Sequence, residues 1–522
     1  MALAEAPGSL GSAAARLLTL LGISGGEART DDVLARLGVD EAVLGELVRA
    51  GAVVERSAHG PRTIALQVPS ARRVAGFGDN SSGQLGDGTM QTPPATVPAR
   101  FGYARAIAMG SDHSLAAGDD PYHRSSATRL YAWGDNVGYA LGDGTNQTSA
   151  LPVRCVGMGD VTQFAAGIGH SLAVQHNGRV WIWGSDFNNL GVLGGAAQTS
   201  APTPVRVPHV PTAQMVAAGQ HFSLTLDHAG NVWAWGTNQL GELGIDSTQT
   251  SVATPTKVTL PRAARAVAAG LHHGLALVDN KVYCWGSNGV GELGDGTYQN
   301  RIAPVAVVGL PARRRLTALA ATNGGSLALE AGGTLWGWGE FGTVPQGGAP
   351  AQVAQIGLSH VKAIAAGADH GLALRADGTV WKLTAGAIGQ VQLSQVGGIV
   401  GAVAVAAGEN CSLALCQGRV EFDPQTIDFG DVPVGGTSQQ SITLSNTGSV
   451  PVAIWQQPWS GNEYLLPGAF SLAGTLPAEL APGASATLTA TFAPAAAGSI
   501  VEYPLFSFDC TLIRLTLSGN GV

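Results

Sequence analysis

The middle of the chain repeats itself, and the length of the repeat restricts the folds available to it. An aromatic residue followed by glycine recurs every 50–56 residues, at Phe77-Gly78, Trp133-Gly134, Trp183-Gly184, Trp235-Gly236, Trp285-Gly286 and Trp338-Gly339. A weaker seventh copy is Val380-Trp381-Lys382-Leu383. Repeats of this length are typical of propellers and solenoids, in which each unit packs against the next.

A second motif precedes each later aromatic-Gly step and also occurs seven times. It is Gly110-Ser111-Asp112-His113-Ser114-Leu115 in its first copy, and it recurs at 167–172, 219–224, 270–275, 322–327, 367–372 and 408–413. The first unit lacks this motif, and the last unit leaves the pattern after Val420. Pairing Val74–Gly78 with Ser412–Val420 in one sheet would complete a blade from both ends. We therefore predict a closed seven-bladed β-propeller over 72–420, because closure protects the sheet edges.

Each repeat also contains the pattern of a β-hairpin. His170–Gln175 alternates apolar and polar residues, Asn177-Gly178 supplies a turn, and Arg179–Trp183 alternates back. Trp181 and Trp183 share one face of their strand, so we expect both to pack between neighbouring blades.

Two loops carry a family resemblance. Gly83–Thr89 and Gly291–Thr297 both contain Leu-Gly-Asp-Gly-Thr, and together with the other submotifs they resemble the repeats of the regulator of chromosome condensation family. The resemblance covers about two thirds of the chain and implies the propeller fold. The sixth repeat departs from it at Thr322–Gly325 and in a short 340–350 loop, so that blade should be irregular.

The segments on either side of the repeats have different patterns. In residues 1–70, capped helices are expected at 9–21, 31–37 and 41–50, followed by strands at Val53-Val54 and Ile64–Leu66. This order resembles a winged helix-turn-helix, a small α/β domain. In 421–522, about seven short strands with regular turns predict an immunoglobulin-like β-sandwich. Ile427–Gly435 and the later Pro-Gly and Ala-Pro turns resemble the ASH, or Hydin-like, domain, which implies a binding module.

Charge and cysteine usage exclude several classes of protein. The formal charge of −8, with 12% charged residues, leaves no basic footprint for nucleic acid. The expected recognition helix carries Asp40, Glu41 and Glu46 against Arg49, which favours docking on protein over binding DNA. No apolar run is long enough to span a membrane, and a basic signal-peptide region is lacking. Five sparse cysteines suit a reducing compartment, so we expect a cytoplasmic protein.

The residues capable of chemistry have structural explanations. His113, His170, His273 and His370 occupy one repeat position, which distributes them around a ring, so they need not converge on a metal and we expect hydrogen bonding within each blade. Asp87, Asp143 and Asp295 lie in Asp-Gly turns without the further ligands of a calcium loop. Ser114 and Ser171 follow histidines, but neighbours on a strand point to opposite faces. We therefore assign no catalytic, cofactor-binding or metal-binding residue, and no small-molecule substrate.

Partner-binding candidates lie in the loops, where residues are free to differ between repeats. Several apolar or aromatic residues follow the aromatic-Gly steps: Val137, Tyr139, Phe187, Leu240, Val290 and Phe341. The insertion Asp119–Arg129 adds Tyr122, His123 and Arg124. On one rim these side chains could form a patch for a partner, and the alternative is that they pack locally between loops.

We therefore expect a non-catalytic scaffold or adaptor that binds one or more proteins through its propeller loops. Three alternatives stay open: exchange of guanine nucleotides on a small GTPase, inhibition of an enzyme, and DNA-binding regulation through the N-terminal domain. By analogy alone, the modular layout would suit a bacterial signalling or immune pathway.

Overall fold

The structure is a computed structural model that describes most of the chain. The described residues are 27–29, 53–56, 63–66, 72–101, 104–118, 128–186, 189–195, 199–310, 315–342, 354–386, 390–399, 401–417, 420–424, 426–448, 451–453, 463–465, 469–477, 479–502, 505–508 and 511–522. They divide into two compact units, Arg72–Cys416 and the remainder. Each unit is described by itself.

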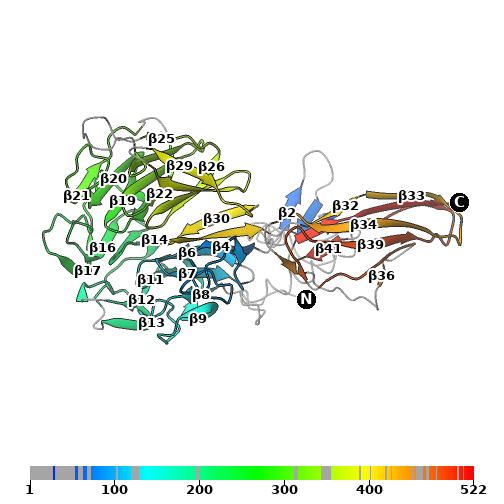
Figure 1. Ribbon diagram of the computed structural model, residues 1–522, viewed down its shortest axis with the longest axis horizontal. Helices are drawn as coiled ribbons and strands as arrows, with labels where there is room; N and C mark the ends of the chain where they lie inside the picture. Colours follow the sequence, from blue (N-terminus) through cyan, green and yellow to red (C-terminus); the bar gives the residue numbers. More distant parts are fainter. Residues whose placement is uncertain are drawn as a thin grey trace. The chain divides into compact units, whose positions relative to one another are not determined.

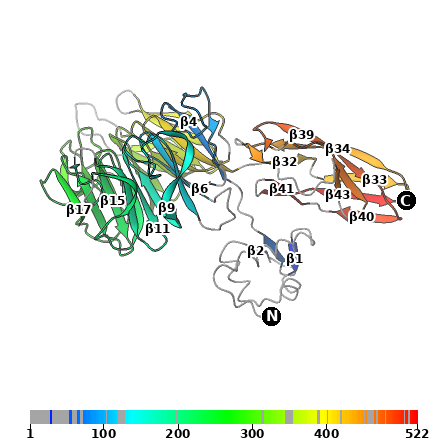
Figure 2. The same ribbon diagram turned by 90° about the horizontal axis from the view of Figure 1, so that it is seen from below.

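The first unit contains seven four-stranded antiparallel sheets, here called blades 1–7 (Figures 1 and 2). Blade 1 comprises β30 (Ala402–Ala407), β31 (Cys411–Gln417), β4 (Arg72–Gly78) and β5 (Val97–Pro98). Blade 2 comprises β6 (Ala104–Met109), β7 (His113–Gly118), β8 (Arg129–Gly134) and β9 (Ser149–Gly159). Blade 3 comprises β10 (Val161–Ala166), β11 (His170–Gln175), β12 (Val180–Ser185) and β13 (Ser200–Arg206). Blade 4 comprises β14 (Ala213–Ala218), β15 (Phe222–Asp227), β16 (Val232–Thr237) and β17 (Ser251–Lys257).

The remaining three blades follow the same order. Blade 5 comprises β18 (Ala264–Ala269), β19 (His273–Val278), β20 (Lys281–Gly286) and β21 (Arg301–Ala306). Blade 6 comprises β22 (Leu316–Ala321), β23 (Gly325–Glu330), β24 (Leu335–Gly339) and β25 (Ala354–Ile356). Blade 7 comprises β26 (Val361–Ala366), β27 (His370–Arg375), β28 (Val380–Ala385) and β29 (Val391–Gln395).

The blades form a closed ring. The first strand of each blade contacts the first strand of the next, and β30 of blade 1 contacts β6 of blade 2. Blade 1 is built from both ends of the array, because β31 lies beside β4 in its sheet (Figure 1). The Asp79 N–H donates to the Asn410 carbonyl across this junction over 3.1 Å. The pairing predicted from the two half-repeats is therefore found.

The propeller core lies between blades. Trp133, Trp183, Trp235, Trp285 and Trp338 are fully buried, each on the third strand of its blade. Trp183 Nε1 donates to the Ala140 carbonyl of the preceding blade over 2.8 Å, and Trp133 makes the equivalent bond to Gln84 over 2.9 Å. Trp181 is half-buried and instead donates to Gln175 of its own blade. Both tryptophans pack against a core that joins neighbouring blades, as expected, and the one next to glycine is fully buried there.

The second unit contains an immunoglobulin-like domain. Its larger sheet has the order β32 (Val420–Asp423), β34 (Ser438–Asn446), β39 (Ser485–Phe492), β37 (Phe470–Ala473), β36 (Glu463–Leu465). The smaller sheet has the order β33 (Thr426–Val432), β43 (Thr516–Gly521), β40 (Gly498–Glu502). Two further pairs join β35 (Val452–Ala453) to β38 (Glu479–Leu480) and β41 (Leu505–Phe508) to β42 (Thr511–Arg514). Phe429, Phe470 and Phe492 meet in its core, the last two stacked with ring centroids 4.7 Å apart.

The N-terminal segment contributes a three-stranded sheet. β3 (Thr63–Leu66) pairs with β2 (Val53–Arg56) and with β1 (Glu27–Arg29), so the two predicted strands form an antiparallel pair. The three predicted helices lie outside the described residues, and the winged-helix interpretation stays a prediction. The described residues contain no α-helix, and hence none long and apolar enough to cross a membrane.

Candidate functional site

One end of the propeller gathers two sets of loops, which together are called the loop face. Inner loops join the first and second strands of each blade, and outer loops join the third and fourth. Alternating strand directions bring both sets to the same end of a blade. Hydrogen bonds link the two sets: the Ser185 N–H donates to the Gly169 carbonyl over 3.0 Å and the Asp135 N–H to the Asp112 carbonyl over 2.8 Å.

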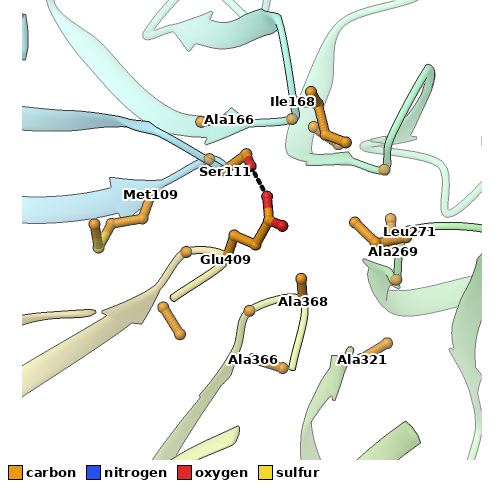
Figure 3. A pocket seen from close by; sticks show the side chains of 18 residues that line it. Met109, Ser111, Ala166, Ile168, Ala269, Leu271, Ala321, Ala366, Ala368 and Glu409 are labelled. Atoms are coloured by element: carbon orange, nitrogen blue, oxygen red, sulfur yellow. Dashed lines mark hydrogen bonds between the residues drawn. The ribbon is translucent and has the colours of Figure 1, made fainter. Parts of the chain in front are cut away.

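A small pocket lies among the inner loops at the centre of the ring (Figure 3). Its volume is about 60 Å³. Its wall is formed by the last residue of every first strand: Met109, Ala166, Ala218, Ala269, Ala321, Ala366 and Ala407. Loop residues Ser111, Ile168, Leu271, Ala368 and Glu409 also line it. The Ser111 hydroxyl donates to the Glu409 carboxylate, as Figure 3 shows.

Close packing of the inner loops explains the glycine that opens the repeated motif. A β-carbon at Gly167 would stand 2.6 Å from the Gly219 carbonyl oxygen of the next blade, and one at Gly408 only 2.5 Å from that of Gly110. At Gly270 a β-carbon would also collide with the ring of His273, 2.5 Å from its Cε1. Glycine at this position therefore lets neighbouring loops and the buried histidine approach each other.

The repeated His-Ser pair joins neighbouring blades. His113 Nε2 lies 2.8 Å from Ser171 Oγ of the next blade, and His273 Nε2 lies 2.9 Å from Ser326 Oγ. The other two pairs are His170 with Ser223 and His370 with Ser412. Ser171 in turn donates to the Ala140 carbonyl over 2.9 Å. Since the hydroxyl proton is used there, His113 Nε2 must be the donor to Ser171.

In two of the three blades where the histidine is replaced, the serine of the next blade is replaced too. In the third, blade 1 carries Cys411 at the histidine position, and blade 2 keeps Ser114, whose hydroxyl donates to the Gln84 carbonyl. Phe222 occupies the histidine position of blade 4, and Gly274 occupies the serine position of blade 5. Gly325 and Gly371 are the corresponding pair in blades 6 and 7. Both changes remove a donor together with its acceptor, so no buried polar group is left without its partner in the pair. The pair is thus a structural unit.

The histidines of these pairs are held neutral. Burial lowers the pKa of His113 to about 4, and it lowers the pKa values of His170 and His273 to about 3. Among the described residues, no group of three or more His, Cys, Asp or Glu side chains is placed to hold a metal ion. The repeated histidine is therefore a buried hydrogen-bonding group and not an accessible base.

The loop face carries acidic residues without basic ones. The outer loops contain Asp79, Asp87, Asp135, Asp143, Asp186, Glu242, Asp246, Glu292, Asp295 and Glu340; the inner loops contain Asp112, Asp369 and Glu409. Neither set contains a lysine or arginine. Arg301, at the start of β21, is paired with Asp295 at 2.7 Å.

The carboxylates on this face influence one another. The pKa of Asp112 is raised by burial and further by the negative charges of Glu409, Asp135 and Asp79. Burial, with Glu292 and Asp369, likewise raises the pKa of Glu340. This acidic face was missed in the sequence because a net charge averages over both ends of each blade. Counting charges loop by loop would have found it.

The candidate rim residues fall into different environments. Val137 and Val290 are exposed at 70% and 44%. Tyr139 and Leu240 are half-buried, and Tyr139 adopts φ 61°, which only a minority of non-glycine residues do. Four candidates lie outside the described residues: Tyr122, His123, Arg124 and Phe187.

The expectation that Phe341 lies on the rim is wrong, because its side chain is 1% exposed. A β-carbon at Gly325 would stand 2.6 Å from the ring of Phe341, and one at Gly371 would stand 3.6 Å from it. Gly325 therefore makes room for the Phe341 ring, and Gly371 lies at ordinary contact distance from it. Phe341 packs in the core of blades 6 and 7 beside Leu327 and Leu383.

Comparisons with known proteins agree with this architecture. A model of the RCC1-like domain matches residues 73–381, and a model of the HYDIN/CFA65/VesB-like, Ig-like domain matches residues 418–520. The ultraviolet-B receptor UVR8 of Arabidopsis thaliana is 27% identical over 336 residues, covering 62% of this chain and 75% of UVR8. Human E3 ubiquitin-protein ligase HERC2 is 32% identical over 242 residues, covering 44% of this chain but 5% of HERC2.

Solved structures share the propeller fold. Prp20p from Saccharomyces cerevisiae aligns with a TM-score of 0.56 at 22% identity, over 67% of this chain and 92% of Prp20p. Human WBSCR16 aligns with a TM-score of 0.55 at 19% identity, over 66% of this chain and 99% of that one. At these identities the likeness concerns the fold.

Proposed function

This chain belongs to the RCC1-like domain family, and on that premise we propose that it is a non-catalytic interaction protein whose loop face binds a protein partner. The observation that carries the proposal is the charge of that face. Every blade has at least one acidic residue in its inner or outer loop, and none of these loops contains lysine or arginine. Such a surface attracts and orients a partner with a basic patch.

A non-catalytic role is supported by the environment of the repeated histidines and serines. His113 and Ser171, for example, are 1% and 0% exposed and are hydrogen-bonded to each other. A buried hydroxyl that donates to a carbonyl is neither reachable by a substrate nor activated as a nucleophile. The residues that most resemble a catalytic pair thus contribute to joining the blades.

The flanking domains extend the same proposal. An immunoglobulin-like domain and an N-terminal segment beside a propeller suit an adaptor that holds several proteins together, with the N-terminal segment docking on protein. We also place the chain in the cytoplasm. In support, Cys155, Cys284, Cys411 and Cys416 are buried and form no disulfide among the described residues.

The proposal is tested by affinity capture from the native host, comparing the full chain with the triple variant Asp112→Asn, Asp369→Asn, Glu409→Gln. Mass spectrometry should find a protein with a basic surface that the full chain retains and the variant loses. Retention of the same proteins by both chains would exclude the loop face as the binding surface. Thermal unfolding of both chains controls for misfolding.

A further inference from the structure

The central pocket is too small for the usual small-molecule ligands. Nucleotides and cofactors occupy pockets of several hundred Å³, whereas this one measures about 60 Å³. Its walls are rigid, because they are formed by strand ends and by loops packed through glycine. Its dimensions therefore suit one slender side chain that reaches in from a partner.

The polar groups around the pocket are mostly hydrogen-bond acceptors. Backbone N–H groups of five inner loops are already used between blades: Ser111 donates to Gly167, Ala368 to Gly408 and Glu409 to Ser111. Gln220 and Asn323 donate in the same way. The accepting carbonyls keep a second lone pair, and the Glu409 carboxylate can accept more than the one bond from Ser111. A matching side chain must therefore bring donors.

The pocket also has an apolar side. Ile168 and Leu271 lie across the pocket from Glu409 (Figure 3), and the methyl groups of the alanine ring form the wall. A matching side chain must therefore carry an apolar stem as well as its donor group. Lysine has both, a slender four-carbon stem and a compact ammonium with three donors, whereas the planar guanidinium of arginine is broader.

We propose that the central pocket takes a lysine side chain of the partner, with its ammonium bound by the Glu409 carboxylate and its stem against Ile168 and Leu271. This inference rests on the proposed function, since the lysine belongs to the protein bound on the loop face. Glu409 is then the specificity-determining residue. The acids of the surrounding loops supply attraction that does not depend on side-chain length.

The test uses the full chain and two fluorescein-labelled peptides at low ionic strength, with anisotropy as the readout. One peptide alternates lysine and serine; in the other each lysine is replaced by 2,4-diaminobutyrate, which has the same charge and a shorter stem. The lysine peptide should bind about tenfold more tightly, because only its ammonium reaches Glu409.

Three variants separate the pocket from the surface. Glu409→Gln removes the counter-charge, and Ala368→Leu fills the pocket with the residue that blade 5 carries at the same loop position, Leu271. Each of these two substitutions should lower the affinity for the lysine peptide about tenfold. Ala368→Leu should leave the affinity for the shorter peptide nearly unchanged. Asp246→Asn removes one charge from an outer loop and should cost less than about twofold.

The outcomes distinguish the two proposals. The pocket proposal would be overturned if both peptides bound equally, if Ala368→Leu left the affinity for the lysine peptide unchanged, and if Glu409→Gln lowered it no more than Asp246→Asn does. That result would still allow a basic partner on the loop face. Failure of both peptides to bind at low salt would contradict the basic-partner proposal, and the pocket proposal with it.

Discussion

His113 and Ser171 lie in neighbouring blades, and a buried hydrogen bond of 2.8 Å joins them. The Ser171 hydroxyl in turn donates a hydrogen bond to the Ala140 carbonyl, and Trp183 Nε1 donates to the same oxygen. Three side chains thus anchor one outer loop to two blades. The cohesion of the ring depends on this buried polar chain as well as on apolar packing.

The first prediction concerns this pair. Ser171→Ala should lower the free energy of unfolding by about 1–3 kcal/mol, because it leaves the His113 N–H buried without an acceptor. The double variant His113→Phe, Ser171→Gly copies Phe222 and Gly274, so it should be less destabilised than the sum of its single variants. Urea unfolding followed by tryptophan fluorescence measures Ser171→Ala, the double variant and the two single variants of which it is made. Strict additivity would contradict the view that the pair is a unit.

The second prediction is a loss of stability in mild acid. The pKa values of His113 and His170 in the fold, about 4 and about 3, lie below their ordinary value of 6.5. The unfolded chain therefore binds protons that the folded chain does not. The stability is complete above pH 6.5 and falls as the pH drops toward 4, by up to about 1.4 kcal/mol per pH unit for each histidine.

Urea titrations across this pH window check the expected slope. The double variant His113→Phe, Ser171→Gly lacks one of the histidines and should lose stability less steeply than the unmodified chain. An identical slope in the two proteins would show that His113 does not titrate as its burial implies.

The third prediction concerns Phe341. Phe341→Ala should destabilise the propeller by about 3–5 kcal/mol, because it opens a cavity between blades 6 and 7. Once folded, the variant should retain its affinity for the partner. Thermal unfolding and a binding titration at a temperature where the variant is folded measure the two effects. Weaker binding of the partner together with an unchanged melting temperature would show that Phe341 acts as a surface residue.

The fourth prediction concerns the exposed valines of the loop face. Val137→Ser and Val290→Ser should each weaken binding of the captured partner by about 1–2 kcal/mol without changing the melting temperature of the chain. Val434→Ser is the matched control, since Val434 is 47% exposed and belongs to the immunoglobulin-like domain. Equal effects of all three substitutions would remove Val137 and Val290 from the interface.

The ring could be predicted from the sequence because each of its requirements recurs. The aromatic-Gly step and the Gly-x-x-His motif recur with single replacements around the ring, so their spacing indicates both the repeat and the closure of β31 on β4. The hydrogen bond from His113 to Ser171 was not predicted, because its partners are 58 residues apart. The paired replacement of Phe222 and Gly274 was the available signal in the sequence.

The site was predicted less well because a loop position does not determine the direction of a side chain. Val137 and Phe341 both follow an aromatic-Gly step, yet Val137 is exposed and Phe341 is buried. The difference arises from Gly325, which belongs to another strand and makes room for the ring. The pocket was equally hidden, because it forms only when all seven inner loops converge.

The central claim is that the loop face binds the partner, and hydrogen–deuterium exchange of the full chain with and without the captured partner tests it most directly. The account predicts slower exchange in the inner loops, such as 167–169 and 270–272, and in the outer loops beside them, with Glu409→Gln reducing that protection. Protection confined to the hairpin turns at the other end of the blades, such as 176–179 and 228–231, with the inner loops unchanged, would contradict it.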